Sequence, residues 1–320
     1  MLLSFNETSE LIAQAKHLHI SGAEDLLKKL PKGNWIGGST EYFMTKKGGV
    51  VTGEELFVTE LSYDTVSIKV YDENDIQNIT ADAYDNGFTI LILPFDSVVH
   101  KFYADQAPEF DNIYSTNIVG WISGVNLGKS GQTPITVNGE TGEVYTNKAV
   151  ALHVCVPDGK FVSIGIINIF EQDHDSQVIE FKEEGFSVTS CLIDGREVVF
   201  ADYIEKNNID TKLPIVGDYS GAGVNVSFKA ISGGIVNFYA PVFPDIKYKM
   251  AKPVKNYEEA FNSKLKSFSE TESAFSCNCI LNFLYGELEG KEMEAFYGPI
   301  TFGEIAYQLV NQTLVYVTVV

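Results

Sequence analysis

The sequence contains no long hydrophobic run: nowhere do about 18 apolar residues follow one another, the length that a membrane-spanning helix needs. Its start, Met1-Leu2-Leu3-Ser4, lacks the basic and apolar segments of a secretory signal peptide. These two absences predict a protein without a membrane anchor that stays in the cytoplasm.

Basic residues are scarce as well. The 23 Lys and Arg residues stand against 43 Asp and Glu residues, which gives a formal net charge of −20 at pH 7. A charge of this sign repels the phosphates of nucleic acids and the surfaces of anionic membranes. We therefore expect neither nucleic acid nor a membrane among the partners.

Cysteine is also rare, with four residues in the chain. Cys277 and Cys279 lie two positions apart on a predicted strand, and so do His153 and Cys155 on another, so each pair projects to one face. The two pairs could form a zinc site if they met, but neither has the spacing of a zinc knuckle. Free, buried cysteines without a disulfide or a metal ion are the simpler expectation.

What the sequence does contain is enough apolar material for a large core. The chain has 320 residues, of which 45% are hydrophobic and 12% aromatic. Because a single core stops growing at roughly 250 to 300 residues, we expect two domains. A polar interval at 171–184 separates apolar segments, and we place one domain at 1–182 and the other at 183–320.

Hydrophobic periodicity predicts many strands and few helices. Two short helices are expected at 7–18 and 23–30, and the continuous apolar run 88–93 is typical of a strand buried on both faces. The Asp158-Gly159 pair predicts a hairpin turn between strands 149–156 and 161–170.

A further helix is expected at 257–268, where large apolar side chains recur at helical spacing on one face. Such a helix is suited to cover one face of a sheet. Together the patterns predict an α+β fold with two similar halves, each a mostly antiparallel sheet covered by helices, packed together.

The most specific pattern lies near the end of the chain. A serine–cysteine strand around Cys277 is followed by the glycine-rich segment 298–305 and then by Asn311-Gln312-Thr313. This order resembles the C-terminal half of the FIST family, and Trp35 to Thr40 resembles a strand and turn of its N-terminal half. In place of the Gly-Glu that follows in the family, this chain has Glu41-Tyr42.

The FIST resemblance implies a sensory, ligand-binding module of signal transduction without catalytic activity of its own. Since no kinase, cyclase or DNA-binding segment is visible, its output would pass to a signalling protein in trans. The expected ligand-binding residues are Ser39, Thr40, Ser123, Cys277, Thr301, Gly303 and Glu304. The ligand is a small molecule, for which an amino-acid-like compound is one option, and any cofactor is left unknown.

Glu304 has two interpretations. Its carboxylate could accept hydrogen bonds from the ammonium group of an amino-acid-like ligand, at a turn where glycines let the backbone come close. It could equally accept N–H groups of its own loop and be structural.

Other functional classes stay open beside the sensor. Some bacterial FIST-like proteins are linked to haem and nitric oxide sensing, and His100 or His153 could be the axial ligand of a haem-based gas sensor. An enzyme could use Cys277, His153 or Glu304 if their pKa values were perturbed in one pocket. A scaffold that has lost its ligand is a third possibility. The segment 124–130 imitates a phosphate loop but has three residues between its glycines instead of four, so no nucleotide is expected.

Overall fold

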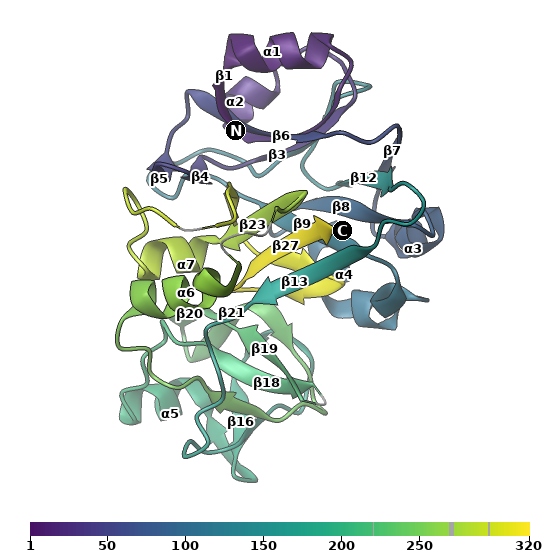
Figure 1. The fold of residues 1–320 in the computed structure, drawn as a ribbon. Coiled ribbons are helices and arrows are strands. Elements are labelled where there is room, and N and C mark those ends of the chain that lie inside the picture. The colour runs from purple at the N-terminus through teal and green to yellow at the C-terminus, as the bar shows by residue number, and fades with distance from the viewer. Residues whose placement is uncertain (220, 269–271, 294) are drawn as a thin grey trace. The chain divides into compact units, whose positions relative to one another are not determined.

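In the computed structural model, mostly antiparallel sheets combine with few helices, which confirms the expected α+β class (Figure 1). The structure describes residues 1–219, 221–268, 272–293 and 295–320. None of the helices in these ranges is both long enough and apolar enough to cross a membrane.

The chain divides into two compact units. Unit 1 comprises Met1–Ile167, Asn262–Leu309 and Thr313–Val320, and unit 2 comprises Asn168–Phe261 and Val310–Gln312. This division does not follow the expected boundary between residues 182 and 183. The reason is that strands from the end of the chain pair with strands of the first half, as the yellow strands beside the teal and blue ones show in Figure 1.

The described part of unit 1 contains three six-stranded sheets. In spatial order, the first consists of β1 (Leu2–Ser4), β6 (Glu55–Leu61), β2 (His17–Gly22), β3 (Trp35–Ser39), β10 (Thr136–Asn138) and β11 (Glu143–Tyr145). The second consists of β26 (Gln308–Val310), β25 (Glu304–Ala306), β9 (Ile118–Ser123), β8 (Gly87–Pro94), β12 (Ala149–Cys155) and β7 (Thr65–Tyr71). The third consists of β13 (Val162–Ile167), β27 (Leu314–Val319), β23 (Phe275–Cys279), β24 (Gly298–Thr301), β4 (Tyr42–Thr45) and β5 (Gly48–Val51).

The apolar run at 88–93 forms the centre of the second sheet, as expected. Every residue of β8 is buried, and the strand lies between β9, to which it is parallel, and β12. A strand covered on both faces carries mostly apolar side chains on both, which explains the lack of alternation in its sequence; the buried exception, Thr89, bonds to His153.

The hairpin predicted around Asp158-Gly159 is wrong. The turn itself exists, and Gly159 has the positive φ of 81° that it needs. However, β12 already pairs with β7 on one side and with β8 on the other, so it has no free edge for β13. Strand β13 pairs instead with β27, and the turn carries the chain from the second sheet to the third.

The predicted helices form, but with different bounds: the first begins before residue 7, and residues 17 and 18, expected in it, belong to β2. Helix α1 (Phe5–Ala13) begins with a capping box made by Ser4 and Glu7 and ends before β2. Helix α2 is Glu24–Leu27, and α6 is Tyr257–Leu265 followed by a short turn of tighter helix at Lys266–Phe268.

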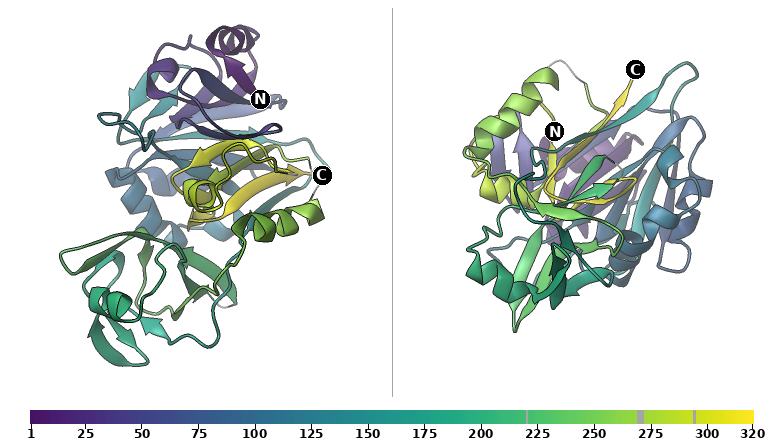
Figure 2. Two further views of the ribbon diagram at one scale, coloured as in Figure 1. Left: turned by 90° about the vertical axis from the view of Figure 1, so that its left-hand side faces the viewer. Right: turned by 90° about the horizontal axis from the view of Figure 1, so that it is seen from below.

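Unit 2 has its own sheets, drawn in teal to green in Figure 2, and its own core. One sheet consists of β17 (Arg196–Val199), β16 (Ser190–Ile193), β14 (Ile179–Glu180), β22 (Tyr248–Met250), β18 (Ile215–Tyr219) and β19 (Ala222–Val226). The other consists of β15 (Gly185–Val188), β21 (Ile235–Val242) and β20 (Phe228–Ser232). Together with helix α5 (Phe200–Lys206) they enclose a core rich in aromatic rings, among them Phe181, Phe200 and Phe238.

Candidate functional site

Glu304, the carboxylate predicted to bind a ligand, is fully buried on β25, and its carboxyl group is hydrogen-bonded to two threonines of the same chain. Its Oε1 accepts a hydrogen bond from the Thr301 hydroxyl at 3.0 Å. Its Oε2 accepts one from the Thr313 hydroxyl at 2.8 Å and one from the Thr313 backbone N–H at 3.2 Å. Of the two interpretations of Glu304, these bonds correspond to the structural one, in which the carboxylate accepts hydrogen bonds from the protein itself.

Burial also controls the ionisation of this carboxyl group. It raises the pKa of Glu304 to about 8, against the hydrogen bonds from Thr313, Thr301 and Cys279 that lower it. The group is therefore largely protonated at neutral pH. A protonated carboxyl keeps its contacts because threonine hydroxyls can accept as well as donate hydrogen bonds.

The structure brings the two predicted segments together, but it leaves almost no space between them. The Thr40 hydroxyl donates to the Ile300 carbonyl at 2.7 Å, next to Thr301. The Ser39 hydroxyl donates to the Gly124 carbonyl at 2.8 Å. The cavity lined by Ser39 and Thr40 has a volume of about 10 Å³, enough for at most about one water molecule.

The remaining predicted residues are also packed. Ser123 is fully buried, and its Oγ has no hydrogen-bond partner among the described residues. Gly303 has a φ of 150°, a backbone conformation that favours glycine, and a Cβ there would press on the Ile122 side chain at 3.0 Å. The Cys277 thiol donates to the Gly120 carbonyl at 3.4 Å.

Neither Cys277 nor His153 has the environment of an activated catalytic group. Burial, with the nearby Glu304 as a second cause, raises the pKa of Cys277 well above its usual range, which disfavours the reactive thiolate. His153 is buried, and its Nδ1 lies 2.8 Å from the Thr89 hydroxyl and its Nε2 lies 3.0 Å from the Tyr71 hydroxyl. Since Tyr71 donates its own proton to Asp82 at 2.8 Å, Nε2 is the donor to Tyr71 and Nδ1 the acceptor. Both ring nitrogens of His153 therefore take part in hydrogen bonds within the protein.

Metal ligands are not gathered in the part of the chain that the structure describes. No group of three or more His, Cys, Asp or Glu side chains lies where it could hold a metal ion there.

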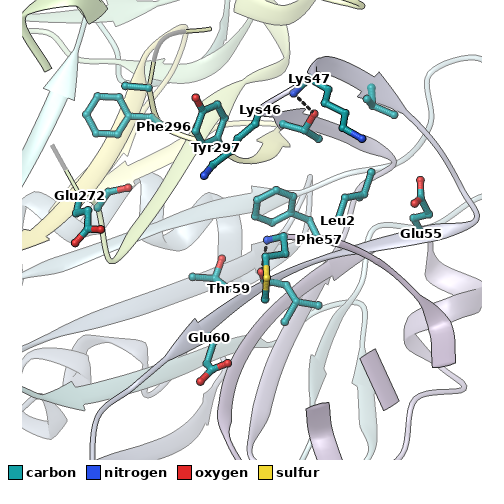
Figure 3. Close-up of a pocket in the computed structure, with 16 residues that line it drawn as sticks. Leu2, Lys46, Lys47, Glu55, Phe57, Thr59, Glu60, Glu272, Phe296 and Tyr297 are labelled. Atoms are coloured by element: carbon teal, nitrogen blue, oxygen red, sulfur yellow. Dashed lines mark hydrogen bonds between the residues drawn. The ribbon is translucent and has the colours of Figure 1, made fainter. Parts of the chain in front are cut away.

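A large cavity lies elsewhere in unit 1, and we call it the Lys46 groove (Figure 3). Its volume is about 1100 Å³, which is slightly above the range of roughly 300 to 1,000 Å³ that small-molecule sites usually have. Strands β1, β4, β5 and β6 contribute to its walls together with the segments beside β23 and β24. The lining residues are Met1, Leu2, Thr45, Lys46, Lys47, Val50, Glu55, Phe57, Val58, Thr59, Glu60, Glu272, Ser273, Ala295, Phe296 and Tyr297.

Charges of both signs line the Lys46 groove around apolar surface. Lys46 and Lys47 come from the turn between β4 and β5, and Figure 3 shows the Lys46 side chain beside the ring of Tyr297. The Lys46 Nζ lies 6.0 Å from the centre of that ring, a distance at which a cation is attracted to the aromatic face. The carboxylates Glu55 and Glu60 come from β6.

Most of these charges are available to a ligand. Glu60 forms an ion pair with Lys16 at 2.8 Å. By contrast, Lys46, Lys47, Glu55 and Glu272 have no ion-pair partner among the residues that the structure describes. Sequence reasoning missed the groove. The signal that could have revealed it is a pair of adjacent lysines between two apolar strands in a chain of net charge −20.

A second polar cluster is closed rather than open. The Glu41 carboxylate is 3% exposed and accepts hydrogen bonds from Lys129 Nζ at 2.6 Å, Gln132 Nε2 at 2.7 Å and Asn126 Nδ2 at 2.8 Å. Burial acts to raise the pKa of Glu41, but these hydrogen bonds and the charge of Lys129 outweigh it and lower the pKa. Glu41, which stands at the position where the chain departs from the FIST pattern, thus holds the segment 124–130 in place through its hydrogen bonds to Asn126 and Lys129.

The fold and the groove define a β-rich α+β protein with a candidate small-molecule site in unit 1. The chain belongs to a family of unknown function, DUF6976, whose model matches residues 3–320. The resemblance to the FIST family is therefore wrong, because a different family accounts for nearly the whole chain. Short glycine-rich turns between strands recur in unrelated β-rich proteins, which explains the mistaken likeness. No curated protein and no solved structure matches the chain.

Proposed function

We propose that this protein is a small-molecule-binding module of signal transduction, without catalytic activity of its own, and that the Lys46 groove is its ligand site. The observation that carries this function is the groove itself: about 1100 Å³ lined by aromatic rings and by two lysines without ion pairs among the described residues. Apolar cavities with a few polar groups are where proteins usually bind small ligands.

The lining favours a ligand that carries both charges. A carboxylate or phosphate group would bind Lys46 or Lys47, which are local exceptions in an acidic chain. An ammonium group would bind Glu55 or Glu272, and an apolar portion would contact Phe57. An amino-acid-like zwitterion with an apolar side chain meets all three requirements.

Binding without catalysis is the better match to the lining. The candidate nucleophile Cys277 and the candidate base His153 are buried outside the groove, and neither lines it. We further propose that the module acts in the cytoplasm and passes its signal to another protein chain.

The proposal is tested with a panel of amino acids and related zwitterions. Ligands that raise the melting temperature are then measured by calorimetry on the native chain and on Lys46→Glu. Because a hydrogen bond to a charged group contributes about 1.5 to 3 kcal/mol, the variant should bind at least about tenfold more weakly.

Lys206→Glu is the matched control, since it makes the same change of charge at an exposed position of unit 2. Its affinity should equal that of the native chain. A panel in which no compound raises the melting temperature, or a ligand that Lys46→Glu binds as tightly as the native chain does, would refute the assignment of the groove.

A further inference from the structure

Strand β13 forms an open edge of the third sheet in unit 1. Its one partner among the described strands is β27, to which it is antiparallel. Phe161 and Val320 exchange both of their backbone hydrogen bonds where this ladder begins. Bonded and non-bonded pairs alternate along an antiparallel ladder, so every second residue from there on also bonds to β27. These residues are Ser163, Gly165 and Ile167.

The other residues of β13 direct their backbone groups outward. The N–H and C=O groups of Val162, Ile164 and Ile166 point to the open edge, and no partner for them lies among the described residues. A row of such groups is a template for one more strand.

The sequence of this edge lacks the usual protection against pairing. From Phe161 to Phe170 no residue is charged and none is proline. Phe161 is 72% exposed and Ile166 is 46% exposed. The edge strand β7 of the second sheet, by comparison, carries Lys69, and charged residues on an edge normally block association.

We infer that β13 is a dimerisation edge, which pairs antiparallel with β13 of a second copy of this chain. With a two-fold axis at Ile164, Val162 faces Ile166 of the other copy, and the two Ile164 residues face each other. Each of these pairs exchanges two hydrogen bonds, because all of the residues involved direct their backbone groups outward.

The distribution of charge makes this edge a better place for a second copy to bind than the charged surfaces of the molecule. Two chains of net charge −20 repel each other, and close approach is least costly where neither carries charged side chains. In this register no charged residue of one β13 lies opposite another, and the exposed side chains of Ile166 become covered by apolar neighbours.

The test combines the mass of the native chain in solution with residue-level amide hydrogen exchange. We expect the mass of two chains, with slow exchange at Val162, Ile164 and Ile166 that becomes fast on dilution. Ser163 and Gly165 should exchange slowly at every concentration, because their amides bond to β27.

The variant Ile166→Lys should raise the dissociation constant of the dimer by about tenfold or more, because an unpaired charge would be buried at the new ladder. Leu284→Lys is the matched control, since Leu284 is 42% exposed on helix α7 (Ile280–Tyr285) and receives the same change. It should leave the dimer unchanged.

Three results would overturn the inference. The first is a native chain with the mass of one copy at all concentrations. The second is a dimer in which the amides of Val162, Ile164 and Ile166 exchange freely, which would place the interface elsewhere. The third is slow exchange of these amides in a single chain, which would mean that the edge is covered from within.

Discussion

Thr313 holds the carboxyl group of Glu304 with two hydrogen bonds, from its hydroxyl at 2.8 Å and from its backbone N–H at 3.2 Å. The two residues are nine positions apart and both are buried, and the contact joins β25 to the start of β27. The ionisation of one buried carboxyl group is therefore coupled to the ends of two core strands.

The stability of the native chain should fall as the pH rises from about 4.5 to about 8, where the unfolded chain has ionised Glu304 and the native chain still holds its proton. Burial raises its pKa from an ordinary 4.5 to about 8, so its stabilising contribution is fully present below about pH 4.5 and is lost as the pH rises through about 8. Glu304→Gln cannot ionise and should lack this loss, which is up to about 1.4 kcal/mol per pH unit. Urea unfolding at several pH values measures it. Equal slopes for the variant and the native chain would show that Glu304 is ionised throughout.

For two buried histidines we expect the opposite dependence: the stability of the native chain should fall as the pH drops into the mildly acidic range. Burial lowers the pKa of His19 to about 3 and that of His153 to about 4, both from an ordinary 6.5. Their contribution is fully present above about pH 6.5 and is lost as the pH falls, because the unfolded chain takes up the protons first. We expect each to contribute up to about 1.4 kcal/mol per pH unit below this point. His153→Gln should reduce the slope of stability between about pH 6.5 and 5, and an unchanged slope would contradict this.

The Glu41 cluster predicts that the buried carboxylate matters more than its visible ion pair. Lys129 is 53% exposed, so Lys129→Met should cost less than about 1 kcal/mol of unfolding free energy. Glu41→Gln turns a carboxylate that accepts three hydrogen bonds into an amide, and it should cost about 1 to 3 kcal/mol. Chemical denaturation of both variants measures the difference. Equal losses would show that the ion pair carries the effect.

Haem should not bind His153. Both of its ring nitrogens are bonded to hydroxyl groups, so an iron ligand would require these bonds to break. We expect no stoichiometric change in the Soret absorption when haem is added under reducing conditions. A six-coordinate spectrum that is lost in His153→Ala or His100→Ala would instead support the haem-based gas sensor.

Features that depend only on residues close together in the chain could be predicted from the sequence. The run 88–93 is apolar except for Thr89, a pattern typical of a strand covered on both faces, and β8 is such a strand. The helical spacing at 257–268 likewise predicted α6. Composition and these patterns together were enough for the α+β class.

Strand pairing was decided by the tertiary structure. The turn at Asp158-Gly159 has a strong local signal for a hairpin, yet β12 is taken on both sides by strands far away in the sequence. Local turn chemistry cannot report which edges are free, because this depends on every other strand of the sheet. The family resemblance failed for a similar reason, since short turn motifs carry little information about the fold around them.

The candidate site likewise could not be predicted from local patterns. Composition and local residue patterns were enough to show that the chain is acidic, rich in strands and well supplied with glycine-rich turns, and they predicted Glu304 at one of these turns, whereas it begins strand β25. The enclosure of Glu304, and the meeting of Lys46, Phe57 and Tyr297 around one groove, became visible in the folded structure. Burial and cavity shape arise from the packing of non-local strands, and no single segment of the sequence records them.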